Sequence, residues 1–315
     1  MAITLADVKM NAQDALSAHV IDEFRKSSFL LDNLTFDDAV NPAGGGAAMT
    51  YAYTRVTTQP TAATRAVGSE YVPQEAKKTR MSVDLKVLGG SFDIDRVLAG
   101  MGGVIDEVQF QIGQKVKATQ ALFSDMVING DTVSDMYGFD GLSKALTGSD
   151  TEVETSIDLS TSALITENYM QFLDELDEMI AKLDGAPTCL LGNSAMMAKV
   201  RAVARRASMY QTNKDDWGNL IEYYGGIPLI DLGAKSGSTD PIIETVAGKT
   251  SLYAVRMGLD GFHGVTMNSQ SPIRTWLPDF ETAGTVKRGE VEMVAAVALK
   301  STRAAAVLRG VKISA

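Results

Sequence analysis

The sequence has few of the residues that build metal centres and covalent frameworks. Its 315 residues include one cysteine, Cys189, and two histidines, His19 and His263. A single thiol excludes an intramolecular disulfide and a zinc site built from several cysteines. Two histidines exclude most histidine-rich metal sites and leave few catalytic bases that titrate near neutral pH. We therefore expect no metal and no cofactor.

Long apolar runs are missing as well. The longest extends from Met293 to Leu299 and has seven residues, whereas a membrane-spanning helix needs about 20. The N-terminal segment MAITLADVKMNAQDAL has no basic start followed by an apolar stretch, unlike a secretory signal. We expect a chain that has no membrane partner and stays in the cytoplasm, or in whatever is assembled there.

The balance of charge is negative. Lys and Arg number 29 and Asp and Glu number 39, which gives a formal net charge of −10. Tight nucleic-acid binding depends on cations that neutralise phosphates, so an acidic chain is a poor starting point for it. Hydrophobic residues make up 45% and charged residues 22%, as in folded soluble proteins. The length suits one large domain or two to three subdomains.

Two alternating stretches predict a ribbon of two strands. Apolar and polar residues alternate across residues 49–57 and again across 81–87. A polar connection from Thr58 to about Lys78 separates them, and a structureless connection of that length usually means a functional loop. Because an isolated two-stranded ribbon is marginally stable in water, we expect this one to lie on another surface, such as a neighbouring subunit.

Helical periodicity is clearest before and after this ribbon. Residues 5–26 predict an amphipathic helix, and the three glycines within residues 41–48 predict a flexible joint after it. The strongest signal starts after Gly102-Gly103 and ends at Asn129-Gly130. A helix of that extent is about 39 Å long, longer than most helices of compact domains.

The second half of the chain predicts a layer of helices and strands, followed mainly by strands. Thr166 and Asn193 are the expected N-caps of two helices that flank a short buried strand at 188–191. From Asn219 onward strands predominate, with a hairpin at Gly225-Gly226. The fold class expected from these patterns is α+β.

Catalytic patterns are weak throughout. Cys189 lies in an apolar strand, and its use as a nucleophile would need an activating base such as His263. Asp93 and Asp95 alternate on one strand face and form a candidate acid–base pair without a supporting second motif. We expect no enzymatic activity. A soluble α/β enzyme that uses Cys189 or a carboxylate pair is kept as an alternative hypothesis.

The order of the elements resembles the major capsid proteins of tailed phages, which have the Hong Kong 97-type coat fold. Residues 49–88 resemble the extended loop of that family, and residues 103–129 resemble its spine helix. Three further segments resemble the turn after the spine, a strand with a Gly-x-Pro step and the closing strands: INGDTVSDMYGFDGL, NLIEYYGGIPLIDL and VEMVAAVALKSTRAAAVLRGVKI.

The resemblance implies a division of the chain into four parts. The axial domain would be built of α/β layers and the peripheral domain would carry the spine helix, about 103–129. The parts would be an N-arm at 1–30, a peripheral domain at 31–48, 87–145 and 271–300, an extended loop at 49–86, and an axial domain at 146–270 and 301–315.

The same resemblance implies a function in assembly. Copies of the chain would form hexamers and pentamers of an icosahedral phage head that encloses double-stranded DNA, with only weak DNA contact. The implied partners are further copies of the chain, a portal, a separate scaffolding protein and a decoration protein. The implied location is the virion, assembled in the host cytoplasm. A related encapsulin-like nanocompartment, which encloses proteins, is the first alternative.

The expected assembly contacts lie in the extended loop. We expect its strands to present Tyr51, Tyr53, Met81, Val83 and Val87 without cover from their own chain, so that a neighbour removes them from water at about 25 cal/mol per Å² of apolar area. The full set of candidate contact residues is Tyr51, Tyr53, Arg65, Tyr71, Lys77, Lys78, Arg80, Met81 and Val83.

Overall fold

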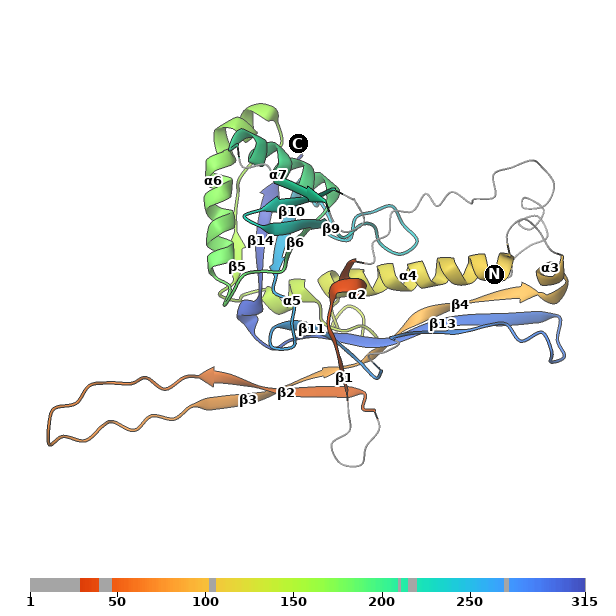
Figure 1. Cartoon of the computed structure of the whole chain (residues 1–315), viewed down its shortest axis with the longest axis horizontal. Helices are drawn as coiled ribbons and strands as arrows, with labels where there is room; N and C mark the ends of the chain where they lie inside the picture. The colour runs from red at the N-terminus through yellow and green to blue at the C-terminus, as the bar shows by residue number, and fades with distance from the viewer. Residues whose placement is uncertain are drawn as a thin grey trace.

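The computed structural model describes residues 29–39, 47–101, 106–208, 211–214, 220–268 and 272–314, without the side chains of 211–214, 220 and 221. The N-terminal helix expected at 5–26, which includes His19, and most of the glycine joint lie outside the described residues. Figure 1 shows an elongated molecule with a thin ribbon at one end, a long helix at the other and an α/β lobe between them. In the part that is described, no helix has the length and apolar character needed to cross a membrane.

The first sheet lies along the long helix α4, Glu107–Asn129. Its central strand β13 pairs antiparallel with β4 over ten residue pairs, from Val286 opposite Asp95 to Ala295 opposite Lys86. The face of this sheet that includes Leu88 and Met293 packs on Phe123 and Val127 of α4. The strands are β1 (Phe36–Asp38), β11 (Phe262–Thr266), β13 (Val286–Leu299), β12 (Ile273–Trp276) and β4 (Lys86–Asp95).

The second sheet forms the α/β lobe and has seven strands. Helices α6 (Ser162–Ala181) and α7 (Ser194–Arg206) pack on it through a core that includes Phe172, Leu176 and Met197. In spatial order the strands are β5 (Glu152–Glu154), β14 (Ala305–Lys312), β10 (Lys249–Val255), β6 (Cys189–Gly192), β9 (Ile227–Asp231), β8 (Leu220–Tyr224) and β7 (Gln211–Lys214).

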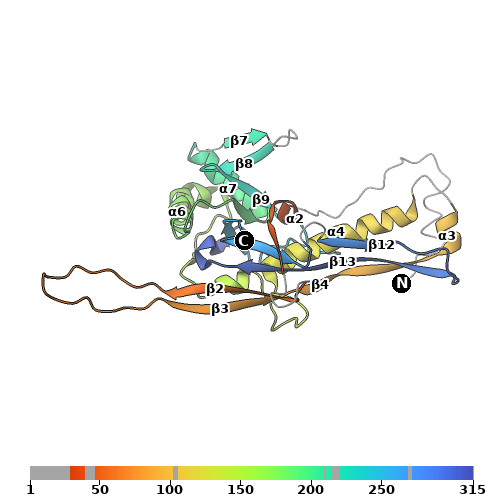
Figure 2. The ribbon, with the colours of Figure 1, turned by 60° about the horizontal axis from the view of Figure 1, so that its bottom comes forward.

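Short elements connect these parts, and a separate ribbon leaves them. The ribbon consists of β2 (Thr50–Thr58) and β3 (Lys77–Asp84), which among the described strands pair only with each other. Both views show its far end well away from the rest of the molecule (Figures 1 and 2). The connecting elements are α2 (Phe29–Asn33), α3 (Arg96–Gly100), α5 (Leu142–Leu146) and η1 (Thr302–Ala304).

Two helix starts were compared with the sequence-based expectation. Helix α4 begins at Glu107, where the Asp106 carboxylate accepts hydrogen bonds from the backbone N–H groups of Val108 and Gln109, and residues 103–105 of the expected helix lie outside the described residues. Helix α6 begins at Ser162 with Thr161 as its cap. The Thr166 hydroxyl instead donates to the carbonyl of Ser162 within the helix. The predicted cap of α7, Asn193, is confirmed, since its side chain accepts from Met196 N–H at 2.8 Å.

Strand β11 also departs from the expected division of the chain. It lies within 146–270, the segment assigned to the axial domain, but it pairs with β13 and β1 in the sheet under α4. The pairing extends from Phe262 opposite Leu299 to Thr266 opposite Ala295. We therefore place β11 with the long helix. The other domain boundaries stay predictions.

Candidate assembly surface

The ribbon has two different faces. Because paired residues share a face, Tyr51, Tyr53 and Arg55 lie on the same side as Val83 and Met81. In β2 these three residues are half-buried, while the alternate positions are exposed. Beyond Arg55 the remaining residues of β2 are exposed, so the contact between ribbon and body is confined to the part near the first sheet. We call this part, residues 50–55 and 79–84, the ribbon root.

Three side chains attach the ribbon root to the first sheet. The Tyr51 hydroxyl donates to the Asp37 carboxylate at 2.7 Å, and the Tyr53 hydroxyl donates to the backbone carbonyl of Leu299 at 2.9 Å. The Arg55 guanidinium donates to the carbonyls of Leu299 and Lys300 at 2.6 and 2.9 Å. Burial, followed by the bond to Asp37, raises the pKa of Tyr51 above its usual range, so this phenol is a hydrogen-bond donor at neutral pH.

The root contacts correct one expectation. We expected Tyr51, Tyr53 and Val83 to have no cover from their own chain, but all three pack against a small cluster that includes Val265 and Ala298. The expectation failed because these contacts depend on tertiary structure, as in the bond from Tyr53 to Leu299, which joins residues 246 positions apart in sequence. Met81 and Val87 are exposed, as expected. A role in assembly for any of these residues stays a prediction.

The outer ribbon, by which we mean residues 56–78, holds its shape with few contacts and leaves apolar groups in water. The Gln74 side chain accepts from the N–H and hydroxyl of Thr61, which links the two arms. The guanidinium of Arg65 lies 5.3 Å from the centre of the Tyr71 ring. Tyr71 is 61% exposed and its neighbour Val72 is 82% exposed. This surface carries apolar area that the described part of the chain does not cover.

Basic side chains dominate the charge of the outer ribbon. Residues 58–80 contain four basic and two acidic residues, in contrast to the acidic chain as a whole. Lys77, Lys78 and Arg80 are exposed on β3. All of the predicted contact residues of the outer ribbon are therefore accessible to a partner, while Tyr51, Tyr53 and Val83 are in contact with the body.

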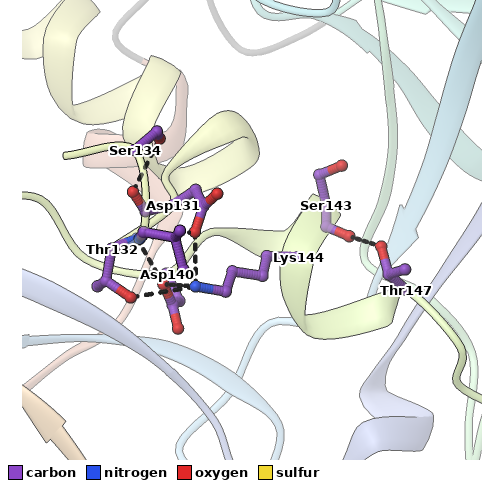
Figure 3. A network of polar contacts seen from close by, with 8 residues as sticks. Asp131, Thr132, Ser134, Asp140, Ser143, Lys144 and Thr147 are labelled. Atoms are coloured by element: carbon purple, nitrogen blue, oxygen red, sulfur yellow. Dashed lines mark hydrogen bonds and ion pairs between the residues drawn. The ribbon is translucent and has the colours of Figure 1, made fainter.

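The turn after α4 is held by a network of polar contacts (Figure 3). The Lys144 ammonium donates to Asp131 at 2.6 Å, to Asp140 at 2.8 Å and to the hydroxyl of Thr132 at 3.1 Å. The bond from Lys144 lowers the pKa of the Asp131 carboxyl. This network fixes a turn whose apolar residues Val133, Met136 and Tyr137 are 70% exposed or more. The turn was predictable from the sequence, whereas these ion pairs were not.

Two glycines allow this turn to form. A Cβ atom on Gly130 would lie 2.2 Å from the carbonyl oxygen of Phe139, and one on Gly141 would lie 2.6 Å from that of Met126. The N–H of Gly141 donates to the Gly130 carbonyl at 2.8 Å. The backbone therefore closes directly on the end of α4, where a side chain has no room.

The residues considered for catalysis have structural roles. Cys189 is fully buried, and burial raises the pKa of its thiol to about 12, which makes a thiolate nucleophile inaccessible at neutral pH. Asp93 pairs with Arg288 at 2.8 Å, and Asp95 caps α3 by accepting from Val97 N–H. Among the described residues no group of three or more His, Cys, Asp or Glu side chains could hold a metal ion.

The structure is similar to solved structures, although no family model and no curated protein matches the sequence. The SrpI encapsulin complex of Synechococcus elongatus is similar in structure, with a TM-score of 0.65 and 15% identity over 100% of this chain and 98% of that one. The capsid of a native GTA particle gives 0.64 and 13% over 96% of both chains. The capsid of Myoviridae phage XM1 gives 0.60 and 12% over 99% of both.

The chain has the Hong Kong 97-type capsid fold. The agreement covers nearly the full length of these structures, so it includes the ribbon, the long helix and the α/β lobe together. The expected α+β class and the resemblance drawn from the order of elements are confirmed. Those solved structures are of an encapsulin complex and of capsids.

Proposed function

We propose that this chain is the repeating subunit of a closed shell, the major capsid protein of a tailed phage. Its copies form hexamers and pentamers of an icosahedral head around double-stranded DNA. The observation that carries this proposal is the outer ribbon, which is exposed, apolar at its tip and, within the described residues, attached to its own body only at the root. Such a surface gains stability when a second copy covers it.

The first sheet offers a matching surface. The face that points away from α4 is covered by the chain's own ribbon root at the Val294 end and is uncovered toward Val286. Val87, Trp276 and Val286 are about half exposed on this side of the sheet. A neighbour's ribbon laid on it would bury apolar area on both partners, at about 25 cal/mol per Å². Repetition over many subunits stabilises the shell although each contact is weak.

The proposed partners follow from this role. The net charge of −10 keeps the contact with packaged DNA weak and salt-sensitive. A portal, a separate scaffolding protein and a decoration protein complete the proposed set of partners. The proposed location is the virion, after assembly in the cytoplasm of a host cell.

The test compares the wild type with a ribbon-shortened variant, in which an Asn-Gly turn replaces residues 59–76. We expect round shells or ring-shaped capsomers from the wild type in negative-stain microscopy. The shortened variant should keep its far-UV circular dichroism and sediment as a small species. The matched control is Met170→Ala, which removes an exposed apolar side chain from α6 and should assemble normally. Equal assembly of the wild type and the shortened variant would contradict the proposal.

A protein-filled nanocompartment is the second candidate, favoured by the similarity to the SrpI encapsulin. The two candidates share the fold, so the contents of the particles must distinguish them. Particles purified after nuclease treatment should contain protected double-stranded DNA if the chain is a phage capsid protein. Particles that contain only protein cargo would favour the nanocompartment.

A further inference from the structure

His263 is a buried histidine with no hydrogen-bond partner. It lies in β11 opposite Ala298 of β13 and is fully inaccessible to solvent. Neither ring nitrogen has a hydrogen-bond partner within the described part of the chain. A buried imidazole normally satisfies at least one nitrogen. The surroundings of the ring must therefore explain why both nitrogens lack a hydrogen-bond partner.

The partner of this ring is the ribbon root. The Tyr51 ring contacts the imidazole edge to face, with 5.7 Å between centroids and an interplanar angle of 75°. The Lys300 ammonium lies 5.4 Å from the centre of the same Tyr51 ring. The Tyr51 hydroxyl is bonded to Asp37. Tyr51 thus connects β2 with β1, with β11 and with the residue that follows β13.

The groups around His263 disfavour a charged ring. The titratable groups that face it are Asp37 from β1, Tyr51 from β2 and Lys300 from the end of β13. Burial lowers the pKa of His263 to about 4 and Lys300 acts in the same direction, while Asp37 and the nearby backbone of Gly261 oppose them. The ring is neutral when Tyr51 packs on it, and a proton would place a second cation close to Lys300.

There is room for the root to move when this contact breaks. A cavity of about 230 Å³ lies between the ribbon root and the body, lined by Tyr53 and Met81 on one side and by Leu142, Phe262 and Leu299 on the other. A closely packed interface would resist displacement, whereas this one leaves space beside Tyr53. The contacts of Tyr51, Tyr53 and Arg55 are therefore the main restraints on the direction of the ribbon.

We propose that His263 is an acid-sensitive latch, which holds the ribbon root through Tyr51 while the imidazole is neutral and releases it when the imidazole takes up a proton. The imidazolium has two N–H donors, and the nearby groups that favour its charge are Asp37, which already accepts from Tyr51, and the backbone of Gly261. Competition for Asp37 and repulsion from Lys300 both weaken the Tyr51 contact. Acidification thus changes the direction of the surface that the proposed shell contact uses.

The direction of the pH effect follows from linkage. The pKa of His263 is lower in the latched state than the usual value of about 6.5 in an unlatched, solvated state. The unlatched state therefore binds more protons between about pH 6.5 and about pH 4. The latch is at full strength above this window, and it weakens as the pH falls through it. The total change in the latching equilibrium is about two orders of magnitude.

Hydrogen exchange measured by mass spectrometry tests this proposal on the unassembled chain. Exchange of peptides from the ribbon root, corrected for the intrinsic effect of pH, should increase at least tenfold between about pH 7 and about pH 4. Peptides from β10 in the second sheet are the internal reference and should not change in this range. His263→Phe keeps an aromatic partner for Tyr51 without a titrating group, and its root should show no such pH response.

A second variant keeps the test decisive if His263→Phe does not fold. Lys300→Met removes the cation near the ring, so the exchange transition of this variant should occur at a higher pH than that of the wild type. Absence of a transition in the wild type, or an unchanged transition in both variants, would overturn the latch. These measurements need no shell. If hydrogen exchange of the ribbon root does not depend on pH, the proposed capsid function still holds. If the chain never assembles, the latch can still be observed.

Discussion

The guanidinium of Arg55 donates to the backbone carbonyl of Leu299 at 2.6 Å, and this bond joins the ribbon to the end of the longest strand of the first sheet. A second bond from the same side chain reaches the carbonyl of Lys300. Arg55 is the last residue of β2 with substantial burial before the ribbon leaves the body. The position from which the ribbon projects is therefore set by this one side chain together with Tyr51 and Tyr53.

Replacement of Arg55 should loosen the ribbon root. Arg55→Ala removes two bonds from a charged donor to backbone carbonyls, and we expect a loss of about 1–2 kcal/mol in the free energy of unfolding. Arg80→Ala is the matched control, because Arg80 is exposed on the other face of the ribbon, and it should change stability by less than about 0.5 kcal/mol. Urea denaturation measures both. Equal losses in the two variants would refute the assigned role of Arg55.

Gly141 should tolerate no side chain. Gly141→Ala places a Cβ atom 2.6 Å from the Met126 carbonyl oxygen and 2.8 Å from the Gly130 nitrogen, and we expect destabilisation by about 1–3 kcal/mol. A methyl group added to Gly113 in α4 would meet no atom within 4 Å, so Gly113→Ala should stabilise the helix by about 0.5–1 kcal/mol. Thermal unfolding should shift in opposite directions for the two variants. Shifts of the unfolding temperature in the same direction for both variants would contradict this prediction.

The Lys144 network should make the turn after α4 sensitive to acid. Hydrogen bonding to Lys144 lowers the pKa of Asp131 in the folded chain, so this stabilisation is complete above the usual carboxyl value of about 3.9 and is lost as the pH falls through the lowered one. Lys144→Met should weaken this dependence on pH and speed exchange of the Thr132 N–H, which donates to Asp140. Amide exchange by NMR provides the measurement. An unaltered Thr132 rate would show that the ion pairs do not hold the turn.

The outer ribbon should affect assembly without affecting the stability of a single chain. Tyr71→Asp combined with Val72→Asp places charge on two exposed apolar positions and should abolish shells or capsomers in sedimentation velocity. The urea midpoint of the unassembled chain should stay the same, since exposed substitutions usually change stability by less than about 0.5 kcal/mol. Met170→Asp, at an exposed position of α6, is the control. Normal assembly of the double variant would show that Tyr71 and Val72 are not part of the contact surface.

Cys189 should be inert in the folded chain. Because burial raises the pKa of its thiol, we expect reaction with a thiol reagent at neutral pH only after denaturation. Cys189→Ala should keep the ability to assemble. Rapid labelling of the native protein, together with an enzymatic activity lost in Cys189→Ala, would favour the alternative enzyme hypothesis.

Local patterns predicted the elements of this fold well. The alternation in residues 49–57 lies in β2, that in residues 81–87 covers the end of β3 and the start of β4, and the apolar stripe that ends at Asn129 lies in α4. These features depend on residues close together in sequence, so periodicity and terminal glycines reveal them. The order of the elements then carried the resemblance to the capsid fold, which no single motif could have done.

Contacts between distant segments could not be predicted from the sequence. The bond from Arg55 to Lys300 spans 245 positions, and the contact of Tyr51 with His263 depends on the pairing of β11 with β13. The position of β11 was misassigned for the same reason. From the sequence, His263 was a candidate only as a partner of Cys189, because a lone histidine in a strand gives no signal of an aromatic neighbour.

Electron cryomicroscopy of the purified particles tests the central claim most directly, because a map can show which subunit the outer ribbon contacts. We predict closed shells in which residues 59–76 of each copy lie on the first sheet of a neighbouring copy, on the face that includes Val87 and Trp276. A solitary chain in solution, with its ribbon folded back on its own body, would contradict the account.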